Sequence, residues 1–305
     1  MNSAQVSNAL TNKIDWQALT RTALIIRRDI IKMLGIAGSG HPGGSLSSTD
    51  ILTLLYFHHM RHDAKNPKWP DRDRLIFSKG HGCPALYSAL ARAGYFDPKM
   101  LLTLRQLNSP LQGHPDMRRL AGIEASTGSL GQGLSIGIGC ALAARFDKKD
   151  FKTYVIFSDG ELDEGQTWEA AAFAAHHKLS NLIGILDYNK YQLSGATKDI
   201  LNMEPVAGKW QAFGWETREI NGHDHHEVSD ALDWARHQDV GGQAKAAKSA
   251  PRIIIANTIK GKGVSFMENN NHFHGVANTK DETARALKEL GEEDGEIQRI
   301  LGLIV

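Results

Sequence analysis

The sequence predicts an α/β fold of three layers, in which a mostly parallel central sheet is flanked by helices. Short apolar runs typical of buried strands alternate along the chain with segments whose apolar residues recur at helical spacing. One of these alternations, residues 153–189, has the length of an ordinary βαβ unit, which joins two parallel strands. A single domain over residues 1–305 accommodates all of the elements, because a chain of this length can bury a large core.

The amino-terminal part begins with a polar tail, residues 1–15, and continues with two helices. Apolar residues at helical spacing predict the first helix at 16–38, and the glycine-rich segment 37–45 ends it in what we expect to be a tight loop. The polar residues 48–50 can cap a second helix at 51–60, because short polar side chains bond the free N–H groups of a first turn.

A loop marked by Pro67 and Pro70 separates these helices from a short apolar strand at 74–78. The next apolar segment, 85–93, has the pattern of a helix. Residues 108–133 then hold seven glycines or prolines and little periodicity, which predicts a long ordered loop. Long loops in compact domains are usually functional.

The second half of the chain supplies the remaining strands and helices. Small residues predict a helix at 133–146, and an apolar strand, a helix and a second strand follow at 153–160, 167–177 and 182–189. The same alternation continues with a strand at 214–220, a helix at 228–236 and a strand at 252–258. Residues 241–250 interrupt it with a Gly-, Ala- and Lys-rich segment that we expect to be a variable surface loop.

Composition excludes several classes of protein. Lysine and arginine total 35 against 34 for aspartate and glutamate, so we expect neither nucleic acid nor an anionic membrane as a partner. Cys83 and Cys140 have neither disulfide nor zinc spacing, which favours a reducing cytoplasm. The polar start lacks the layout of a signal peptide, and no apolar run approaches the ~18 residues of a spanning helix. A soluble cytoplasmic protein is therefore expected.

Asp159 and Asn189 occupy corresponding places in the βαβ unit, since each comes at the end of a predicted strand. A right-handed connection brings both to the carboxyl edge of a parallel sheet, where they face one crevice. A carboxylate, an amide oxygen and a backbone carbonyl form an all-oxygen set that suits Mg²⁺ or Ca²⁺ and that phosphate oxygens would complete. Taken separately, the segments that hold Asp159 and Asn189 are each more typical of an ordinary turn after a strand.

Seven sequence motifs, two of which contain Asp159 and Asn189, occur along the chain in an order that resembles a known family. They are SGHPGGSLS at 39–47, SKGHGCPALY at 78–87, GHP at 113–115, STGSLGQGLS at 126–135, SDGELDEGQTWEA at 158–170, DYNKYQLSG at 187–195 and HFHG at 272–275. From about residue 21 to 278 the chain resembles the amino-terminal half of transketolases. This resemblance implies the three-layer thiamine-diphosphate-binding fold.

The resemblance implies where cofactor and metal bind. Asp159 and Asn189, with the carbonyl of Tyr191, would hold Mg²⁺, or Ca²⁺ or Mn²⁺ in its place, while Gly160 lets the backbone approach the diphosphate of thiamine diphosphate. The family's GDG has Ser158 as its first residue here, which leaves the ligand unchanged. Loop residues expected beside the cofactor ring are Gly128, Ser129 and Leu130, with Ser129 in a position where related enzymes have proline.

Four histidines match the family's active-site histidines. By analogy His81 and His274 lie near the diphosphate and the reacting carbon, His114 near the terminal hydroxyl of the donor, and His41 near the carbonyl of the acceptor. Histidine suits a reaction that moves protons on sugar hydroxyls near neutral pH. A single histidine is more often structural, but four that lie beside glycines in predicted loops favour a catalytic role.

The sequence leaves two alternative roles for each of two further charged residues. Glu164 matches a family acid at the subunit interface that links paired active sites, although an acidic residue is also typical of a first helical turn. Lys260, in IKGKG, either reaches toward the cofactor or is solvated.

The resemblance implies an enzyme that transfers a two-carbon ketol unit between sugars or sugar phosphates. In the family, the carboxylate that activates the cofactor and the residues that bind the sugar phosphate lie in the second half. We therefore expect a separate carboxyl-terminal subunit, which would join this chain in an α2β2 heterotetramer. Two alternatives remain: another thiamine-diphosphate enzyme component, of the 2-oxo-acid dehydrogenase or 1-deoxyxylulose-5-phosphate synthase type, and a non-catalytic cofactor-binding subunit.

Overall fold

Five parallel strands form the central sheet of the protein. The computed structural model describes residues 14–236 and 250–304. In spatial order the strands are β1 (Arg74–Phe77), β2 (Thr153–Ser158), β3 (Leu182–Tyr188), β7 (Arg252–Asn257) and β6 (Glu216–Asn221). Every neighbouring pair in this sheet runs parallel, as expected from the sequence. Outside it, β4 (Tyr191–Gln192) and β5 (Gly195–Ala196) form a small antiparallel hairpin.

Eleven α-helices lie within the described residues. They are α1 (Trp16–Ala37), α2 (Pro42–Ser47), α3 (Thr49–Leu54), α4 (Cys83–Arg92), α5 (Gln132–Phe146), α6 (Gly165–His176), α7 (Thr197–Ile200), α8 (Val206–Ala212), α9 (His225–Arg236), α10 (Lys280–Glu289) and α11 (Asp294–Leu301). None of these described helices has the length and apolar character needed to cross a membrane.

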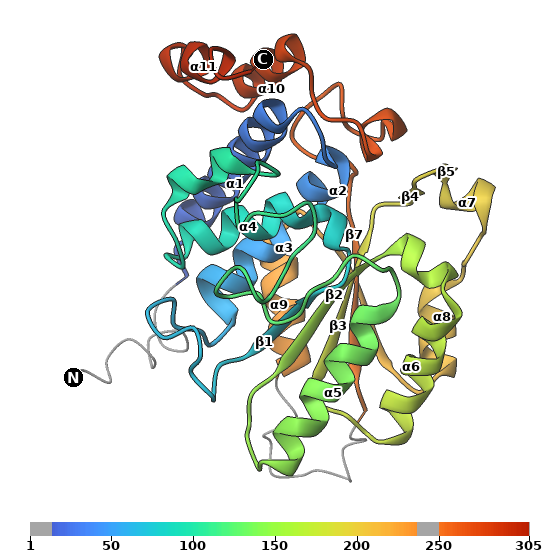
Figure 1. Ribbon diagram of the computed structural model, residues 1–305. Coiled ribbons are helices and arrows are strands. Elements are labelled where there is room, and N and C mark those ends of the chain that lie inside the picture. Colours follow the sequence, from blue (N-terminus) through green and yellow to red (C-terminus); the bar gives the residue numbers. More distant parts are fainter. Residues whose placement is uncertain (1–13, 237–249, 305) are drawn as a thin grey trace.

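Strands β1, β2, β3 and β7 are largely buried on both faces, whereas the edge strand β6 is mostly half-buried or exposed. The sheet divides the interior into two hydrophobic cores. Side chains alternate along a strand, so Tyr154 and Ile156 of β2 pack in one core while Val155 and Phe157 pack in the other. The first core holds the apolar faces of α1, α3, α4 and α9, and the second those of α5, α6 and α8 (Figure 1). The result is the three-layer arrangement that the sequence predicted.

The direction of chain travel explains which helix covers which face. From β1 to β3 the chain moves across the sheet in one direction, and the crossover helices α5 and α6 lie on the second-core face. From β6 to β7 it moves in the opposite direction, and α9 lies on the first-core face. This agrees with right-handed connections between parallel strands, which place the helix on opposite faces when the direction reverses.

Two local predictions were wrong. The glycine-rich segment 37–45 is only partly a loop, because α2 begins at Pro42, whose ring is compatible with the first turn of a helix. The predicted helix 51–60 begins two residues earlier, as α3, and changes to a single π-helical turn at Leu55–His59. The predicted tail 1–15, apart from residues 14 and 15, and the predicted loop 241–250, apart from residue 250, lie outside the described residues.

Candidate active site

Four neighbouring strands, β1, β2, β3 and β7, end at the same edge of the sheet, and the segment after each one contributes to a single cavity of about 380 Å³. Such a volume is in the range of small-molecule sites. The residues that line the cavity are His41, Gly44, His81, Gly128, Leu130, Ser158, Asp159, Gly160, Asp163, Glu164, Asn189, Tyr191, Gln192, Leu193, Lys260 and His274. Most of the residues predicted from the sequence are therefore brought together.

Asp159 and Asn189 meet at the cavity, as expected from the parallel strands that precede them. Asp159 is buried, and its carboxylate accepts hydrogen bonds from the backbone N–H groups of Gly160 (3.2 Å) and Lys190. The amide oxygen of Asn189 accepts one from the N–H of Tyr191 at 3.1 Å. Burial and the nearby Asp187 raise the pKa of Asp159 to about 7. A bound cation would stabilise its charged form.

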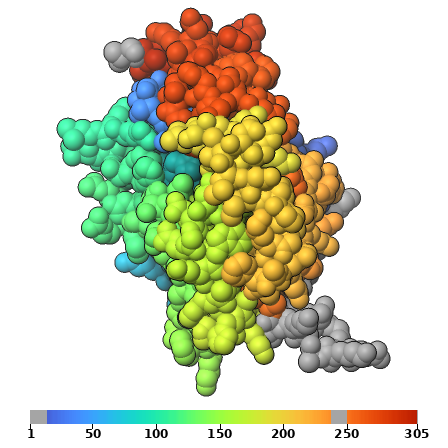
Figure 2. All heavy atoms as spheres, turned by 90° about the vertical axis from the view of Figure 1, so that its right-hand side faces the viewer, coloured from blue at the N-terminus to red at the C-terminus, as the bar shows by residue number. Residues whose placement is uncertain are grey.

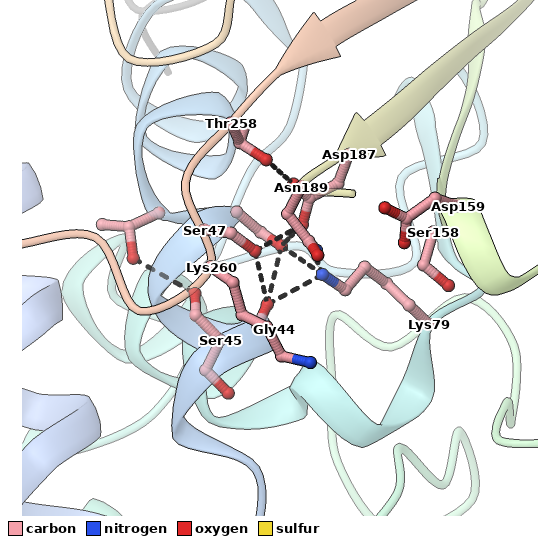
Figure 3. Close-up of polar contacts among 12 residues, drawn as sticks. Gly44, Ser45, Ser47, Lys79, Ser158, Asp159, Asp187, Asn189, Thr258 and Lys260 are labelled. Atoms are coloured by element: carbon pink, nitrogen blue, oxygen red, sulfur yellow. Dashed lines mark hydrogen bonds and ion pairs between the residues drawn. The ribbon is translucent and has the colours of Figure 1, made fainter. Parts of the chain in front are cut away.

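Beneath these oxygens lies a fully buried ion pair between Lys79 and Asp187, which the sequence analysis did not identify (Figure 3). The Lys79 ammonium also donates to the carbonyl of Gly44 (2.8 Å) and the hydroxyl of Ser48 (3.0 Å). The other donors to Asp187 are the hydroxyls of Ser47, Ser48 and Thr258. Burial by itself would raise the pKa of Asp187, but Lys79 holds it below its ordinary value.

This ion pair ties the middle and end of α2 to the ends of β1 and β3. Asp187 precedes Asn189 by two residues, and Lys79 precedes His81 by two residues, so the pair fixes the backbone from which both site residues extend. Gly44 approaches closely, since a Cβ added there would lie 3.3 Å from Nε2 of His81.

We expect Lys79→Met to lower the free energy of unfolding by about 3–5 kcal/mol, because it leaves the Asp187 carboxylate without its cation in a site closed to water. Urea denaturation of the chain measures this loss. The matched control is Lys68→Met, an exposed lysine for which a change within about 0.5 kcal/mol is expected. Equal losses for the two variants would show that the buried pair has no special contribution.

Three of the four predicted histidines form a cluster at the cavity. Ring centroids of His41 and His81 are 5.3 Å apart, those of His41 and His274 are 5.8 Å apart, and those of His81 and His274 are 5.5 Å apart. His41 lies directly before α2 and His274 ends a short helical turn that packs against α2. Residues separated by more than 200 positions are thus joined by the packing of two short helical segments.

Burial makes these histidines neutral at physiological pH. Chiefly through burial, and secondarily through Arg105, the pKa of His41 is lowered to about 4. Burial followed by Lys260 lowers the pKa of His274 to about 3, and burial followed by Lys79 lowers the pKa of His81 well below its usual value. Neutral imidazoles can donate or accept a hydrogen bond to a substrate oxygen, or accept a proton. Nδ1 of His41 is buried and has no partner among the described residues.

His114 lies beside this cluster rather than in the lining of the cavity. It contacts the loop that holds Gly128, because a Cβ on Gly128 would lie only 2.9 Å from the His114 ring. Gly128 has φ of +149°, a backbone conformation that favours glycine. Of the three loop residues predicted beside the cofactor, Gly128 and Leu130 line the cavity, whereas Ser129 is exposed and does not.

Glu161 organises the same loop and was also missed. Its buried carboxylate accepts from the Ser78 hydroxyl, from the backbone N–H of Gly131 (2.9 Å) and from the backbone N–H of Ser158 (2.9 Å). These three donors come from the end of β1, the start of α5 and the end of β2. The spacing Ser158-x-x-Glu161 forms a capping box, a signal that is visible in the sequence.

Glu164 and Tyr191 lie at the rim. Glu164 is exposed, precedes α6 directly and lines the cavity. Tyr191 lies two residues after Asn189, begins β4 and also lines the cavity. The expectation that Lys260 could be solvated was wrong: its side chain is 1% exposed, and its ammonium is 2.8 Å from Nδ1 of His274.

A larger cavity, of about 760 Å³, is lined by α1, α3, the start of α9 and the loop after β7, and it shares no lining residue with the first cavity. Asp50 lies within it, but its carboxylate is already bonded to Arg27, His223 and His225. Because its central charge is satisfied internally, this cavity has less capacity to bind a charged ligand than the cavity at the strand ends.

The donor set at the strand ends fits a metal and a diphosphate. Among the described residues no group of three His, Cys, Asp or Glu side chains could hold a metal ion, so a cation there needs amide, carbonyl and ligand oxygens. Asp159 and Asn189 supply buried oxygens of this kind, and Lys260 provides a positive charge within the same cavity. Mg²⁺ commonly binds with one or two protein oxygens together with phosphates.

Known proteins resemble this chain in both sequence and structure. Residues 19–300 match the family described as "Transketolase, thiamine diphosphate binding domain". The 6-deoxy-6-sulfo-D-fructose transketolase subunit SqwG of Clostridium sp. (strain MSTE9) is 46% identical over 90% of this chain and 97% of that protein. An apulose-4-phosphate transketolase subunit of Actinobacillus succinogenes is 42% identical over 92% of this chain and 98% of its own length.

A solved structure gives the same result. The crystal structure of transketolase from Campylobacter jejuni is similar with a TM-score of 0.84 and 33% identity. The similarity covers 95% of this chain and 46% of that one, so the chain spans about half the length of that enzyme.

Proposed function

The chain belongs to the transketolase family through its thiamine-diphosphate-binding domain, and we propose that it is one subunit of a two-subunit transketolase. In this proposal it transfers a two-carbon ketol unit from a ketose or ketose phosphate to an aldehyde. The supporting observation is the cavity at the strand ends, which combines Asp159 and Asn189 with three clustered histidines. A coupled assay of aldose release by the chain together with its partner tests this function.

We propose that Asp159, Asn189 and the carbonyl of Tyr191 hold Mg²⁺, or Ca²⁺ or Mn²⁺, and that Gly160 lies against the diphosphate. Gly160 lines the cavity, and a Cβ added there would make ordinary van der Waals contact with Gln192 at 3.5 Å. When bound, thiamine diphosphate supplies the nucleophilic carbon and stabilises the carbanion, and the protein supplies binding, orientation and electrostatics.

The histidines would act on substrate oxygens. His81 and His274 lie near the predicted diphosphate position, and we propose that they bond the oxygens at the reacting carbon. His41, with its unpartnered Nδ1, would serve the acceptor carbonyl, and His114 would serve the terminal hydroxyl of the donor. With lowered pKa values, His41, His81 and His274 enter the reaction uncharged. Each can therefore bond a substrate oxygen without first losing a proton.

We expect His41→Ala and His114→Ala to lower kcat about 10²-fold or more while changing cofactor affinity little, because their proposed partners are substrate oxygens. Steady-state kinetics of the reconstituted enzyme, with calorimetric titration of cofactor, separates the two effects. His176→Ala, on the exposed side of α6, is the control that should keep wild-type kcat. Unchanged kinetic constants in both active-site variants would make these histidines structural.

Exposed apolar side chains beside the cavity support a partner that covers it. Leu193, at the cavity, is 67% exposed, and Ile200 and Leu201 in the same connection are each 48% exposed. Val276, two residues after His274, is 45% exposed. The segment of β4, β5 and α7 (yellow) lies beneath the carboxyl-terminal part (orange-red) on one face of the molecule (Figure 2), and Asn271 bonds the carbonyl of Leu193. Large apolar side chains exposed beside a ligand cavity are typical of an interaction site.

The exposed face of α5 also supports contact with a partner subunit. Gly139 lies there in the middle of the helix, and a Cβ at this position would meet nothing within 4 Å. An exposed mid-helix glycine costs about 1 kcal/mol relative to alanine, a cost that close approach of another chain would explain. We propose a separate carboxyl-terminal subunit, an α2β2 assembly as the simplest symmetric form, and Glu164 at the subunit interface.

The family assignment favours ketol transfer over the pyruvate chemistry of 2-oxo-acid enzymes, and four histidines at or beside the site suit a substrate with several hydroxyl groups. We propose that the domain extends over the whole chain and that the enzyme works in the cytoplasm, where Cys83 and Cys140 stay reduced.

A further inference from the structure

Lys260 occupies a position from which its ammonium reaches three acceptor atoms. Its Nζ is 2.9 Å from the Asn271 side-chain oxygen, 2.8 Å from Nδ1 of His274 and 3.5 Å from the backbone carbonyl of Gln192. The side chain is almost fully buried, extends from the loop after β7 and lines the active-site cavity.

The orientation of Asn271 determines what Lys260 must do. The Asn271 side-chain nitrogen donates to the carbonyl of Leu193 at 2.9 Å, and because a carbonyl can only accept, the amide oxygen is turned toward Lys260. Lys260 therefore donates to that oxygen. A lysine ammonium has three protons and no acceptor, so its contact with His274 is also a donation.

From this geometry we propose that Lys260 is a positioning residue that fixes His274 as the tautomer with its proton on Nε2. The Nδ1 atom of His274 accepts from Lys260 and so carries no proton of its own. Nε2 then carries the single proton of the neutral ring, and it has no partner among the described residues. The ring is held in place by His81, at 21° between ring planes, and by His41, at 82°.

The consequence for catalysis rests on the proposed function. A neutral imidazole with a fixed N–H donor can polarise a carbonyl or stabilise a developing oxyanion, as the transfer of a ketol unit requires. The opposite tautomer would present an acceptor at Nε2 and would repel the same oxygen. The depressed pKa of His274, about 3, caused by burial and then by Lys260, agrees with a neutral ring under working conditions.

The alternative is a neutral Lys260 amine, whose lone pair would accept a hydrogen bond from Nδ1–H and so favour the opposite tautomer. The Asn271 side-chain oxygen and the Gln192 carbonyl can only accept, so the three protons of the ammonium suit this position better than a neutral amine does. Measurement at pH 6.5 examines the form on which the proposal depends.

The experiment is ¹⁵N NMR of the full chain with labelled histidine, recorded without partner, cofactor or substrate. His274→Gln identifies the His274 signals. In the wild type we expect a pyrrole-like Nε2 bearing the proton and a pyridine-like Nδ1. Lys260→Met should shift the population toward the Nδ1–H tautomer or mix the two, while Lys260→Arg, which retains a donor, should keep the wild-type pattern. Lys262→Met, a half-buried lysine of the same loop paired with Glu268, should leave it unchanged.

In the reconstituted enzyme we expect Lys260→Met to lower kcat about 10-fold or more and Lys260→Arg to recover part of the loss. A wild-type His274 with its proton on Nδ1 would overturn the proposal, and so would an unchanged tautomer in Lys260→Met. The wild-type spectrum decides even where a variant does not fold. Since the tautomer is read without turnover, an absence of ketol transfer would count against the proposed function and not against the tautomer.

Discussion

Tested alone, the chain should transfer no ketol unit, and addition of a polypeptide resembling the carboxyl-terminal half of a transketolase should restore activity. The cavity at the strand ends carries the groups that we propose for the metal, diphosphate and substrate oxygens, but exposed apolar side chains such as Leu193 and Val276 lie beside it. In transketolases the remaining residues that enclose the cofactor site come from the carboxyl-terminal half of the enzyme. The relatives that match this chain over nearly their full length are themselves called subunits.

Partner and cofactor should bind cooperatively. Each would cover surface that the other leaves exposed, and thermodynamic linkage makes such coupling reciprocal. Light scattering with and without the partner should therefore show an α2β2 mass that cofactor and Mg²⁺ stabilise, and the coupled aldose-release assay should show activity only in the mixture.

The control for this experiment is the partner mixed with the Asp159→Ala chain, which should assemble less tightly and remain inactive. Robust ketol transfer by the wild-type chain alone, at catalytic concentration and free of contaminating transketolase, would refute the two-subunit proposal. Activity with pyruvate and none with a ketose would point instead to another enzyme of the same cofactor.

The second large effect concerns the proposed metal ligands. Asp159→Ala and Asn189→Ala should each abolish metal-dependent binding of thiamine diphosphate while leaving the fold intact, because each removes a buried oxygen from the site. Calorimetric titration of the reconstituted enzyme measures the affinity. Thermal unfolding gives a second measurement, since ligand at about 100 times its Kd stabilises the protein by about 2.7 kcal/mol, a gain that the variants should lose.

Asp163→Ala is the matched control, because Asp163 is an exposed carboxylate that lines the same cavity but is not a proposed ligand. It should retain cofactor affinity. If Asp159→Ala and Asn189→Ala bind cofactor as tightly as the wild type, the metal site lies elsewhere. Removal of metal from the wild type with a chelator should reproduce the variant behaviour.

The neutral histidines also bear on how the proposed reaction handles protons. The sequence suggested groups that titrate near neutral pH, but burial lowers the pKa of His41 to about 4 and that of His274 to about 3. These side chains are better suited to donate or accept hydrogen bonds as neutral rings than to deliver a stored proton. The correction comes from burial, which the sequence did not reveal.

Much of the fold follows from local sequence patterns. Apolar runs such as 153–158 and 182–188 pair naturally as buried parallel strands once a helix separates them, and the order of these elements along the chain places Asp159 and Asn189 at one edge of the sheet. The glycine-flanked histidines gave a second, independent signal. In both cases a side chain of suitable chemistry lies where functional residues are common, at the end of a strand or beside a glycine in a loop.

Tertiary structure alone decided the roles of the buried charges. Nothing near Lys79 in the sequence indicates its partner, because Asp187 lies 108 positions away and Ser47 bonds Asp187 across 140 positions. The sequence left Lys260 open between a solvated position and one near the cofactor, because lysine is almost always exposed, whereas in the fold the segments after β3 and β7 enclose it. Burial and the partners of a charge depend on which distant segments converge. The sequence by itself therefore determined the sheet edge and the oxygen atoms that we propose as ligands, while the fold determined which charges lie beside them.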